Sequence, residues 1–204
     1  MKPRRNLRKS QLRECLAQEA ARLMVEDGVR DFGTAKRKAA QQLRAEDARQ
    51  LPRNDEIERA MQEYQRLFRA DRQPHRLREL REMALRAMRF LAPFEPCLVG
   101  PVLRGTADEH SEVTLHLFAD PPEEVNLFLV DHRIPCEMGE KRLRVSADEF
   151  RAYPSYRFVA EGVPIELVVF PHNGRRQPPL SPVDGKPMRR LSLAKFEALG
   201  GELD

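Results

Sequence analysis

The chain has 204 residues, which is enough for one large domain or two small ones, each with its own core. Hydrophobic residues make up 41% of it and charged residues 33%, and the apolar runs are strand-sized, so the composition excludes a membrane-spanning segment. The net charge of +4 is unevenly distributed, because residues 1–92 carry +9 and residues 93–204 carry −5.

Helical spacing of apolar residues dominates the basic first part of the chain. We expect a helix over about 8–27, one that is capped by Thr34, one that begins at Asn54, and one from Pro74 that stops at Pro93. This part therefore predicts a bundle of helices rather than a sheet.

Strand-like alternation begins after Pro93. A short buried strand is expected at 97–99, followed by a strand at 112–118, in which Glu112, Thr114 and His116 share one face. Further elements are expected as a helix at 121–132, strands near 135–138, 141–145, 156–160 and 163–170, an irregular proline-rich stretch at 171–190, and a helix capped by Ser192.

This order of elements predicts an α+β protein, with an N-terminal helical region followed by a domain with a small mixed β-sheet. We place the basic helical region at 1–73, the α+β domain at 74–174, and a proline-rich segment with a short C-terminal helix at 175–204.

The three cysteines are odd in number and have no close spacing, which argues against a disulfide framework and against a zinc site. No apolar signal-peptide region follows the basic first residues. The sequence therefore predicts a cytoplasmic protein with reduced thiols and no membrane partner.

Residues 99–118 contain the pattern that bears most directly on function. A glycine turn at Gly100 leads into Arg104 and Gly105, and a strand with a carboxylate at Glu112 follows about ten residues later. Nucleotidyl transfer requires such parts, because backbone N–H groups bind the triphosphate and strand carboxylates hold two metal ions about 3.5–4 Å apart.

The stretch resembles the nucleotidyltransferase superfamily that includes DNA polymerase β. In its small bacterial members the pattern is Gly-Ser-x-Ala-Arg-Gly, a short loop, and then Ser-Asp-apolar-Asp-Leu. Gly100, Arg104, Gly105 and Ser111 match that pattern, and Glu112 replaces the first aspartate conservatively. The wider resemblance runs from about residue 75 to 171.

Two positions depart from the pattern. Pro101 replaces the serine of the turn and so removes a hydroxyl and a backbone donor, and Thr114 replaces the second aspartate. The resemblance implies Glu112 and Glu166 as catalytic metal ligands, and it implies nucleotide binding by Gly100, Arg104, Gly105, Ser111 and Thr114.

His116 suggests a mixed metal site instead. With Glu112 and Glu166 it would offer nitrogen and oxygen ligands, which favour Mn²⁺ or Zn²⁺ over Mg²⁺. The alternative is a histidine that is hydrogen-bonded at the sheet surface. The acidic loop at 108–110 is expected to be solvated, although one of its carboxylates could be recruited to the site.

A second candidate site lies in the basic helical region. Lys36, Arg37, Lys38 and Arg44 cluster in sequence, and such charges bind phosphate backbones. Because acidic residues are interleaved throughout the region, a plain solvated helix surface is the alternative.

Three functions follow from these patterns. The favoured hypothesis is a nucleotidyltransferase-like protein with a degenerate metal site, which binds a nucleotide or RNA with weak or absent transfer. The alternatives are an active enzyme that uses Mg²⁺ or Mn²⁺ to move a nucleoside monophosphate from an NTP to an RNA, protein or small-molecule acceptor, and a partner-binding module without catalysis.

Overall fold

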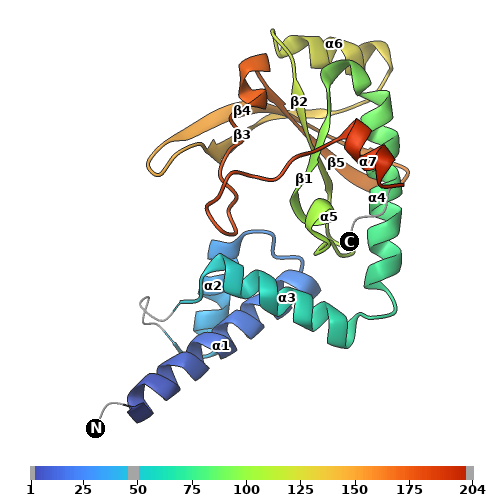
Figure 1. Ribbon diagram of the computed structural model, residues 1–204. Coiled ribbons are helices and arrows are strands. Elements are labelled where there is room, and N and C mark those ends of the chain that lie inside the picture. Colours follow the sequence, from blue (N-terminus) through green and yellow to red (C-terminus); the bar gives the residue numbers. More distant parts are fainter. Residues whose placement is uncertain (1–2, 46–50, 201–204) are drawn as a thin grey trace. The chain divides into compact units, whose positions relative to one another are not determined.

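The computed structural model describes residues 3–45 and 51–200, with side chains from residue 10 onward within those ranges (Figure 1). The chain divides into two compact units. The first unit comprises the residues up to Gln73 together with Pro182–Asp184, and the second comprises Pro74–Ser181 and the residues from Gly185. No described helix is both long and apolar enough to cross a membrane.

Three helices form the first unit: α1 (Pro3–Glu26), α2 (Phe32–Gln42) and α3 (Asn54–Phe68). Leucines and alanines of α1 pack against Ala35 and Ala39 of α2 and against Ile57 of α3, and all of these are fully buried or nearly so. The sequence predicted Thr34 as the N-cap of α2, and this prediction is wrong. Asp31 is the N-cap, and its side chain accepts a 2.7 Å hydrogen bond from Thr34 N–H.

The second unit combines helices with one sheet. Its elements are α4 (Gln73–Phe90), η2 (Ala92–Phe94), β1 (Cys97–Val99), α5 (Gly100–Arg104), β2 (Val113–Phe118), α6 (Glu123–Asp131), β3 (Glu137–Arg144), β4 (Phe150–Ala160), β5 (Val163–Phe170), η3 (His172–Arg175), β6 (Leu191–Ser192) and α7 (Leu193–Ala198). The first of these helices, α4, begins at Gln73 and stops three residues before Pro93, as the prolines predicted.

The six strands form a single mixed sheet in the order β3-β4-β5-β2-β1-β6. β2 and β5 are parallel, with Thr114 beside Glu166, and the other neighbours are antiparallel. The predicted α+β fold class, with N-terminal helices and a mixed sheet, is confirmed.

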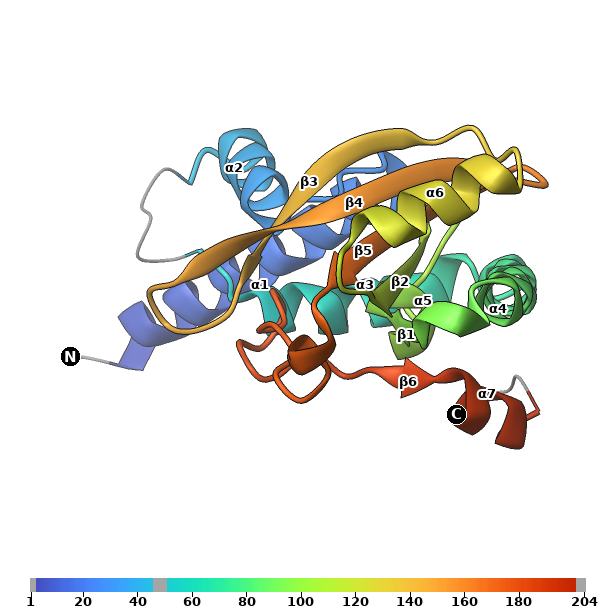
Figure 2. The same ribbon diagram turned by 90° about the horizontal axis from the view of Figure 1, so that it is seen from above.

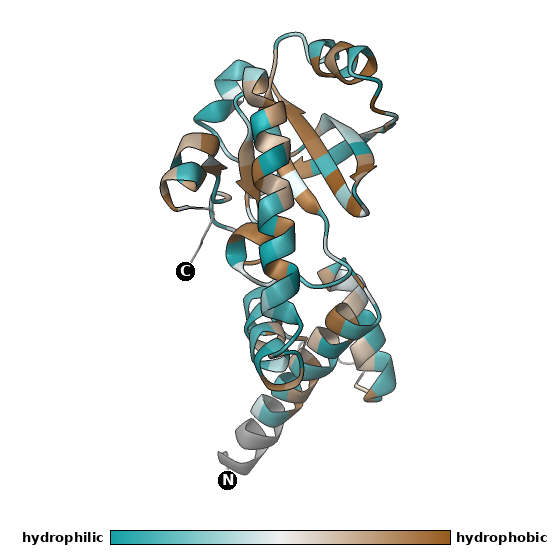
Figure 3. Ribbon diagram, turned by 90° about the vertical axis from the view of Figure 1, so that its right-hand side faces the viewer, coloured by the Kyte–Doolittle hydropathy of each residue, from teal (hydrophilic) through white to brown (hydrophobic). Residues whose placement is uncertain are grey.

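The two faces of the sheet differ in what covers them. Alternate residues of β2 and β5, such as Leu115 and Leu167, pack into the main core with side chains of α4, α5, α6 and α7. The helix α4 presents both polar and apolar surface along its length (Figure 3). The opposite face bears Thr114, His116 and Glu166, and it is the face on which the candidate site lies.

Two segments differ from the sequence-based prediction. β3 and β4 form one long hairpin in place of three short strands, and Figure 2 shows it as a continuous ribbon. Much of the described segment after residue 175 also joins the second unit, because β6 pairs with β1 and the side chain of Phe196 is fully buried in the main core, whereas Pro182–Asp184 belong to the first unit.

Candidate functional site

The turn at Gly100 links β1 to the short helix α5. Gly100 has a φ of +77°, and a Cβ built there would lie 3.8 Å from Thr114 Oγ1 on β2. Gly105, with a φ of +78°, ends α5 and donates its N–H to the carbonyl oxygen of Pro101. Both glycines adopt the left-handed conformation that side chains disfavour, so the turn requires glycine at these positions.

Glu112, Thr114 and Glu166 come together beside this turn. The parallel register of β2 and β5 places Thr114 directly beside Glu166. Arg157 on β4 contacts both carboxylates, at 2.7 Å from Glu166 Oε1 and 3.7 Å from Glu112 Oε1. The structure therefore brings Glu112 and Glu166, which are far apart in sequence, to one group of charges.

Lys141 completes this group from β3. Its Nζ lies 2.9 Å from Glu166 Oε1 and 2.8 Å from Oε2, so one ammonium group bridges both oxygens of the carboxylate. The Glu166 side chain is only 2% exposed, whereas that of Lys141 is 37% exposed. A buried carboxylate requires such compensation, and here two side-chain cations supply it.

The charges in this group balance. Lys141 and Arg157 carry two positive charges, and Glu112 and Glu166 carry two negative charges. Burial lowers the pKa of Arg157, but the charges of Glu166 and Glu112 outweigh that effect and raise the pKa above its usual value. Arg157 is therefore a permanent cation at the position where a metal ion would need to approach these carboxylates.

His116 lies on the same sheet face but has a different partner. Arg190 Nε donates a 2.9 Å hydrogen bond to His116 Nδ1. Because a guanidinium only donates, Nδ1 must be the unprotonated nitrogen, and the ring proton is on Nε2. Neither nitrogen then offers a lone pair to a metal ion.

The residues do not fit the metal sites expected from the sequence. Thr114 is neutral, Glu166 is bound by two cations, and the free lone pair of His116 is taken by Arg190. Among the described residues there is no group of three or more histidine, cysteine and acidic side chains that could hold a metal ion. We therefore derive no chemistry from Mg²⁺, Mn²⁺ or Zn²⁺ at this site.

Burial strongly affects the protonation of His116. The side chain is nearly inaccessible, and this desolvation, together with the charges of Arg190 and Lys141, lowers its pKa well below the usual value. The Arg190 guanidinium also lies over the rings of Phe118 and Phe170, at 5.0 and 4.6 Å from their centroids. Burial lowers the pKa of Arg190 to about 10.

The loop between α5 and β2 is held by its own hydrogen bonds. Ser111 Oγ donates to Asp108 Oδ1 at 2.9 Å and accepts from Asp108 N–H at 2.9 Å. Burial raises the pKa of Asp108 despite these bonds. Ser111, predicted as a nucleotide-binding residue, thus closes the loop that leads into Glu112.

The four basic residues predicted to bind nucleic acid lie on or after α2 and have different surroundings. Lys36 is half-buried, and its pKa is lowered by that burial although Glu56 and Asp55 counteract it. Arg37 and Lys38 are exposed, and Arg44 follows the end of the helix. Nucleic-acid binding by Lys36, Arg37, Lys38 and Arg44 stays a prediction.

The site residues that the sequence analysis predicted did not include Lys141, Arg157 and Arg190. Each contacts a predicted residue that belongs to another element, and Arg190 lies 74 residues from His116. The only signal available was the presence of basic residues in expected strands or in the proline-rich segment. Their roles depend on strand register, which the sequence pattern does not specify.

No known protein family matches the chain, and a search of curated proteins finds no significant match. The resemblance to the nucleotidyltransferase superfamily therefore rests on the residues of the turn, on the carboxylates, and on the order of the elements.

Proposed function

We propose that this chain is a nucleotide-binding protein of the nucleotidyltransferase type that does not transfer the nucleotide. One observation carries the proposal: the buried carboxylate of Glu166 is bridged by Lys141 Nζ and contacted by Arg157, so protein cations occupy the surroundings of both acidic side chains.

The physical reason concerns like charges. A divalent ion bound to Glu166 would be close to the ammonium group that lies 2.8 Å from the carboxylate, and the two cations would repel each other. Two-metal transfer also needs a second carboxylate on β2, and Thr114 cannot supply one. Nucleotide binding does not need these metal ligands, because the Gly100 turn and the adjacent Arg104 can contact phosphates without a metal ion.

Calorimetry with UTP and a label-transfer assay test this proposal together. We expect UTP to bind with the same affinity in EDTA and in Mg²⁺, and we expect no label transfer to the protein or to bulk tRNA. Arg104→Gln should weaken UTP binding by roughly 10- to 100-fold, since a hydrogen bond to a charged group contributes roughly 1.5–3 kcal/mol.

Arg142→Gln is the matched control, because Arg142 is exposed on β3 and its guanidinium lies over the Phe150 ring. It should leave UTP affinity unchanged. Label transfer that requires a divalent ion and is lost in Glu112→Ala would show that the protein is an enzyme, and the proposal would be wrong. Absence of UTP binding would also overturn it.

A further inference from the structure

A cavity of about 530 Å³ lies in the second unit, beyond the ends of β2 and β5 that are remote from Gly100. Its lining includes Ala119 and Asp120, which follow β2, and Pro171, which follows β5, whereas Glu112 precedes β2. The length of β2 separates Glu112 from Ala119 by about 20 Å, at about 3.3 Å per residue. Tyr153 of the lining is nearer to the charged group, because it pairs with Lys141 across the β3–β4 hairpin. The volume lies within the range of small-molecule sites, roughly 300–1,000 Å³.

The walls of the cavity are fixed by hydrogen bonds from outside the lining. Asp120 Oδ2 accepts from His172 N–H at 3.1 Å, and Arg190 donates to the Gly174 carbonyl oxygen at 2.7 Å. Leu180 N–H donates to the Arg144 carbonyl oxygen at 2.7 Å, which ties the proline-rich segment to the end of β3. The cavity is therefore formed by anchored backbone before any ligand arrives.

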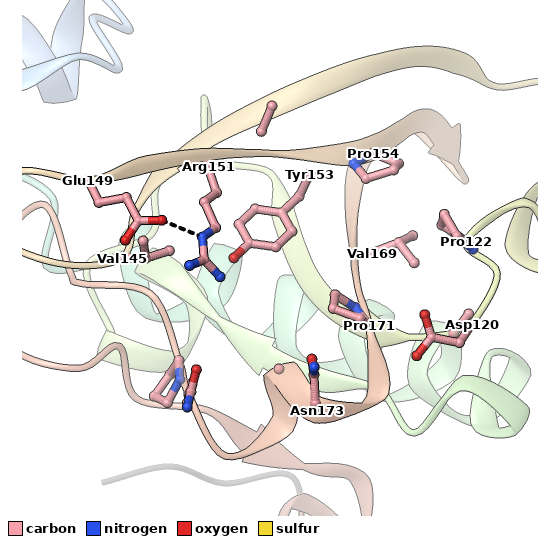
Figure 4. A pocket seen from close by; sticks show the side chains of 15 residues that line it. Asp120, Pro122, Val145, Glu149, Arg151, Tyr153, Pro154, Val169, Pro171 and Asn173 are labelled. Atoms are coloured by element: carbon pink, nitrogen blue, oxygen red, sulfur yellow. Dashed lines mark hydrogen bonds and ion pairs between the residues drawn. The ribbon is translucent and has the colours of Figure 1, made fainter.

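The lining combines flat apolar walls with amide groups. Prolines and valines form much of the wall, and the ring of Tyr153 packs against that of Phe170 with centroids 4.3 Å apart and a 40° angle between the ring planes. Figure 4 shows Tyr153 directed from β4 into the cavity and Asn173 facing it from η3. Gln177 also lines the cavity and supplies a second carboxamide.

The charges of the lining favour a neutral ligand over an anion. Asp120, Glu149 and Arg151 are the charged residues that line the cavity, and Arg151 is engaged at 2.7 Å by Glu149. The net charge of the lining is therefore −1. Asp120 is the acidic residue of the lining that has no basic partner within the lining. A carboxylate accepts hydrogen bonds from amino groups, and carboxamides pair with the edge of an aminopurine.

We infer that this cavity binds a nucleobase with an exocyclic amino group, adenine foremost, as a free nucleoside or within single-stranded RNA. The amino group would donate to Asp120, the carboxamides of Asn173 and Gln177 would bind the remaining base edge, and the base would lie against the Tyr153 ring. The inference does not rest on the proposed function, because the cavity and the Gly100 turn lie at opposite ends of β2.

Calorimetric titration of the full chain with adenosine, uridine and AMP tests the inference. We expect adenosine to bind at least tenfold more tightly than uridine, and AMP to bind no more tightly than adenosine, because the lining is net negative. Asn173→Leu and Gln177→Leu should each weaken adenosine binding about tenfold. Both side chains are exposed, so these variants should fold, and thermal unfolding of each variant checks this.

Gln62→Leu, an equivalent change at an exposed position of α3, is the matched control and should leave adenosine binding unchanged. Arg104→Gln should also leave it unchanged, which separates this site from the Gly100 turn. Displacement of adenosine by hexaadenylate would identify RNA as the source of the base. If hexaadenylate does not displace adenosine, the ligand is a free nucleoside. Equal binding of uridine, absent adenosine binding, or insensitivity to both leucine variants would overturn the inference.

Discussion

Glu166 is the residue whose surroundings most constrain the chemistry of the molecule. Its side chain is almost inaccessible, yet it lies within 3 Å of two cationic side chains from β3 and β4. Removal of one partner from a buried pair costs more than the pair itself contributes, because the remaining charge is left without compensation. This cost is smaller here, because Lys141 and Arg157 are partly exposed and solvent screens their charges.

Lys141→Met should lower the free energy of unfolding by about 1–3 kcal/mol, because Glu166 would lose the ammonium group that bridges its oxygens. Urea unfolding at neutral pH measures this change. Lys195→Met, at an exposed position of α7, is the control and should stay within about 0.5 kcal/mol of the unchanged protein. The double variant Lys141→Met/Glu166→Met should recover part of the loss, and additive losses would argue against coupling.

His116 should make stability depend on pH. Because its pKa is lowered in the folded state, the unfolded chain binds the extra proton first, and stability falls as the pH drops below the unfolded value of about 6.5. The slope that this residue adds is at most about 1.4 kcal/mol per pH unit. His116→Gln, which keeps an acceptor for Arg190, should remove this slope in unfolding titrations between pH 5 and 8.

His110→Gln supplies the comparison for that experiment, because its imidazole is 42% exposed. An identical slope in His116→Gln and the unchanged protein would contradict the assignment of a buried, neutral imidazole.

At the scale of elements, the sequence predicted buried helices and strands better than exposed ones. Helices and the central strands were predicted because their apolar residues form clear patterns. In β5, for example, seven of the eight residues are buried, and six of those seven are apolar. The β3–β4 hairpin was predicted only in pieces, since β3 has no buried residue and β4 has two, Tyr156 and Ser155. Periodicity reports burial, so an exposed hairpin gives a weak pattern.

The short helix α7 supplies a test of whether the proline-rich end belongs to the core. Phe196→Ala should lower the free energy of unfolding by about 3–5 kcal/mol, because its fully buried ring packs in the main core. Leu199→Ala, whose side chain is 51% exposed, should cost less than about 1 kcal/mol. Chemical denaturation of both variants makes the comparison, and similar costs would contradict the packing of α7.

At the scale of the whole molecule, each unit has its own main core among the described residues. Buried residues of α1, α2 and α3 form one cluster, and buried residues of the sheet and of α4 to α7 form another. A small third cluster of Phe118, Val168 and Phe170 lies on the opposite face of the sheet. The site in the second unit was predictable as a set of carboxylates near a glycine turn, because those residues lie in a recognisable order. The cations that neutralise these carboxylates could not be predicted, because the pairing of four strands decides where the cations lie.

Separate cores should unfold separately. Ile57→Ala in the first unit and Leu115→Ala in the second remove side chains that are fully buried, and each should cost about 2–5 kcal/mol. Hydrogen exchange should show loss of protection confined to the unit that contains the change. Protection lost equally in both units after either substitution would show that the molecule unfolds as one cooperative body.

The pairing of Leu98 with Leu191 has a consequence for synthesis on the ribosome. β1 emerges early, next to β2, but its other edge gains a neighbour only after β6 has been translated. During that interval the nascent chain exposes the backbone donors and acceptors of a strand whose final partner does not yet exist. A chaperone that shields extended segments would act in this window, and a chain released before Leu191 would keep that edge open to association with other copies.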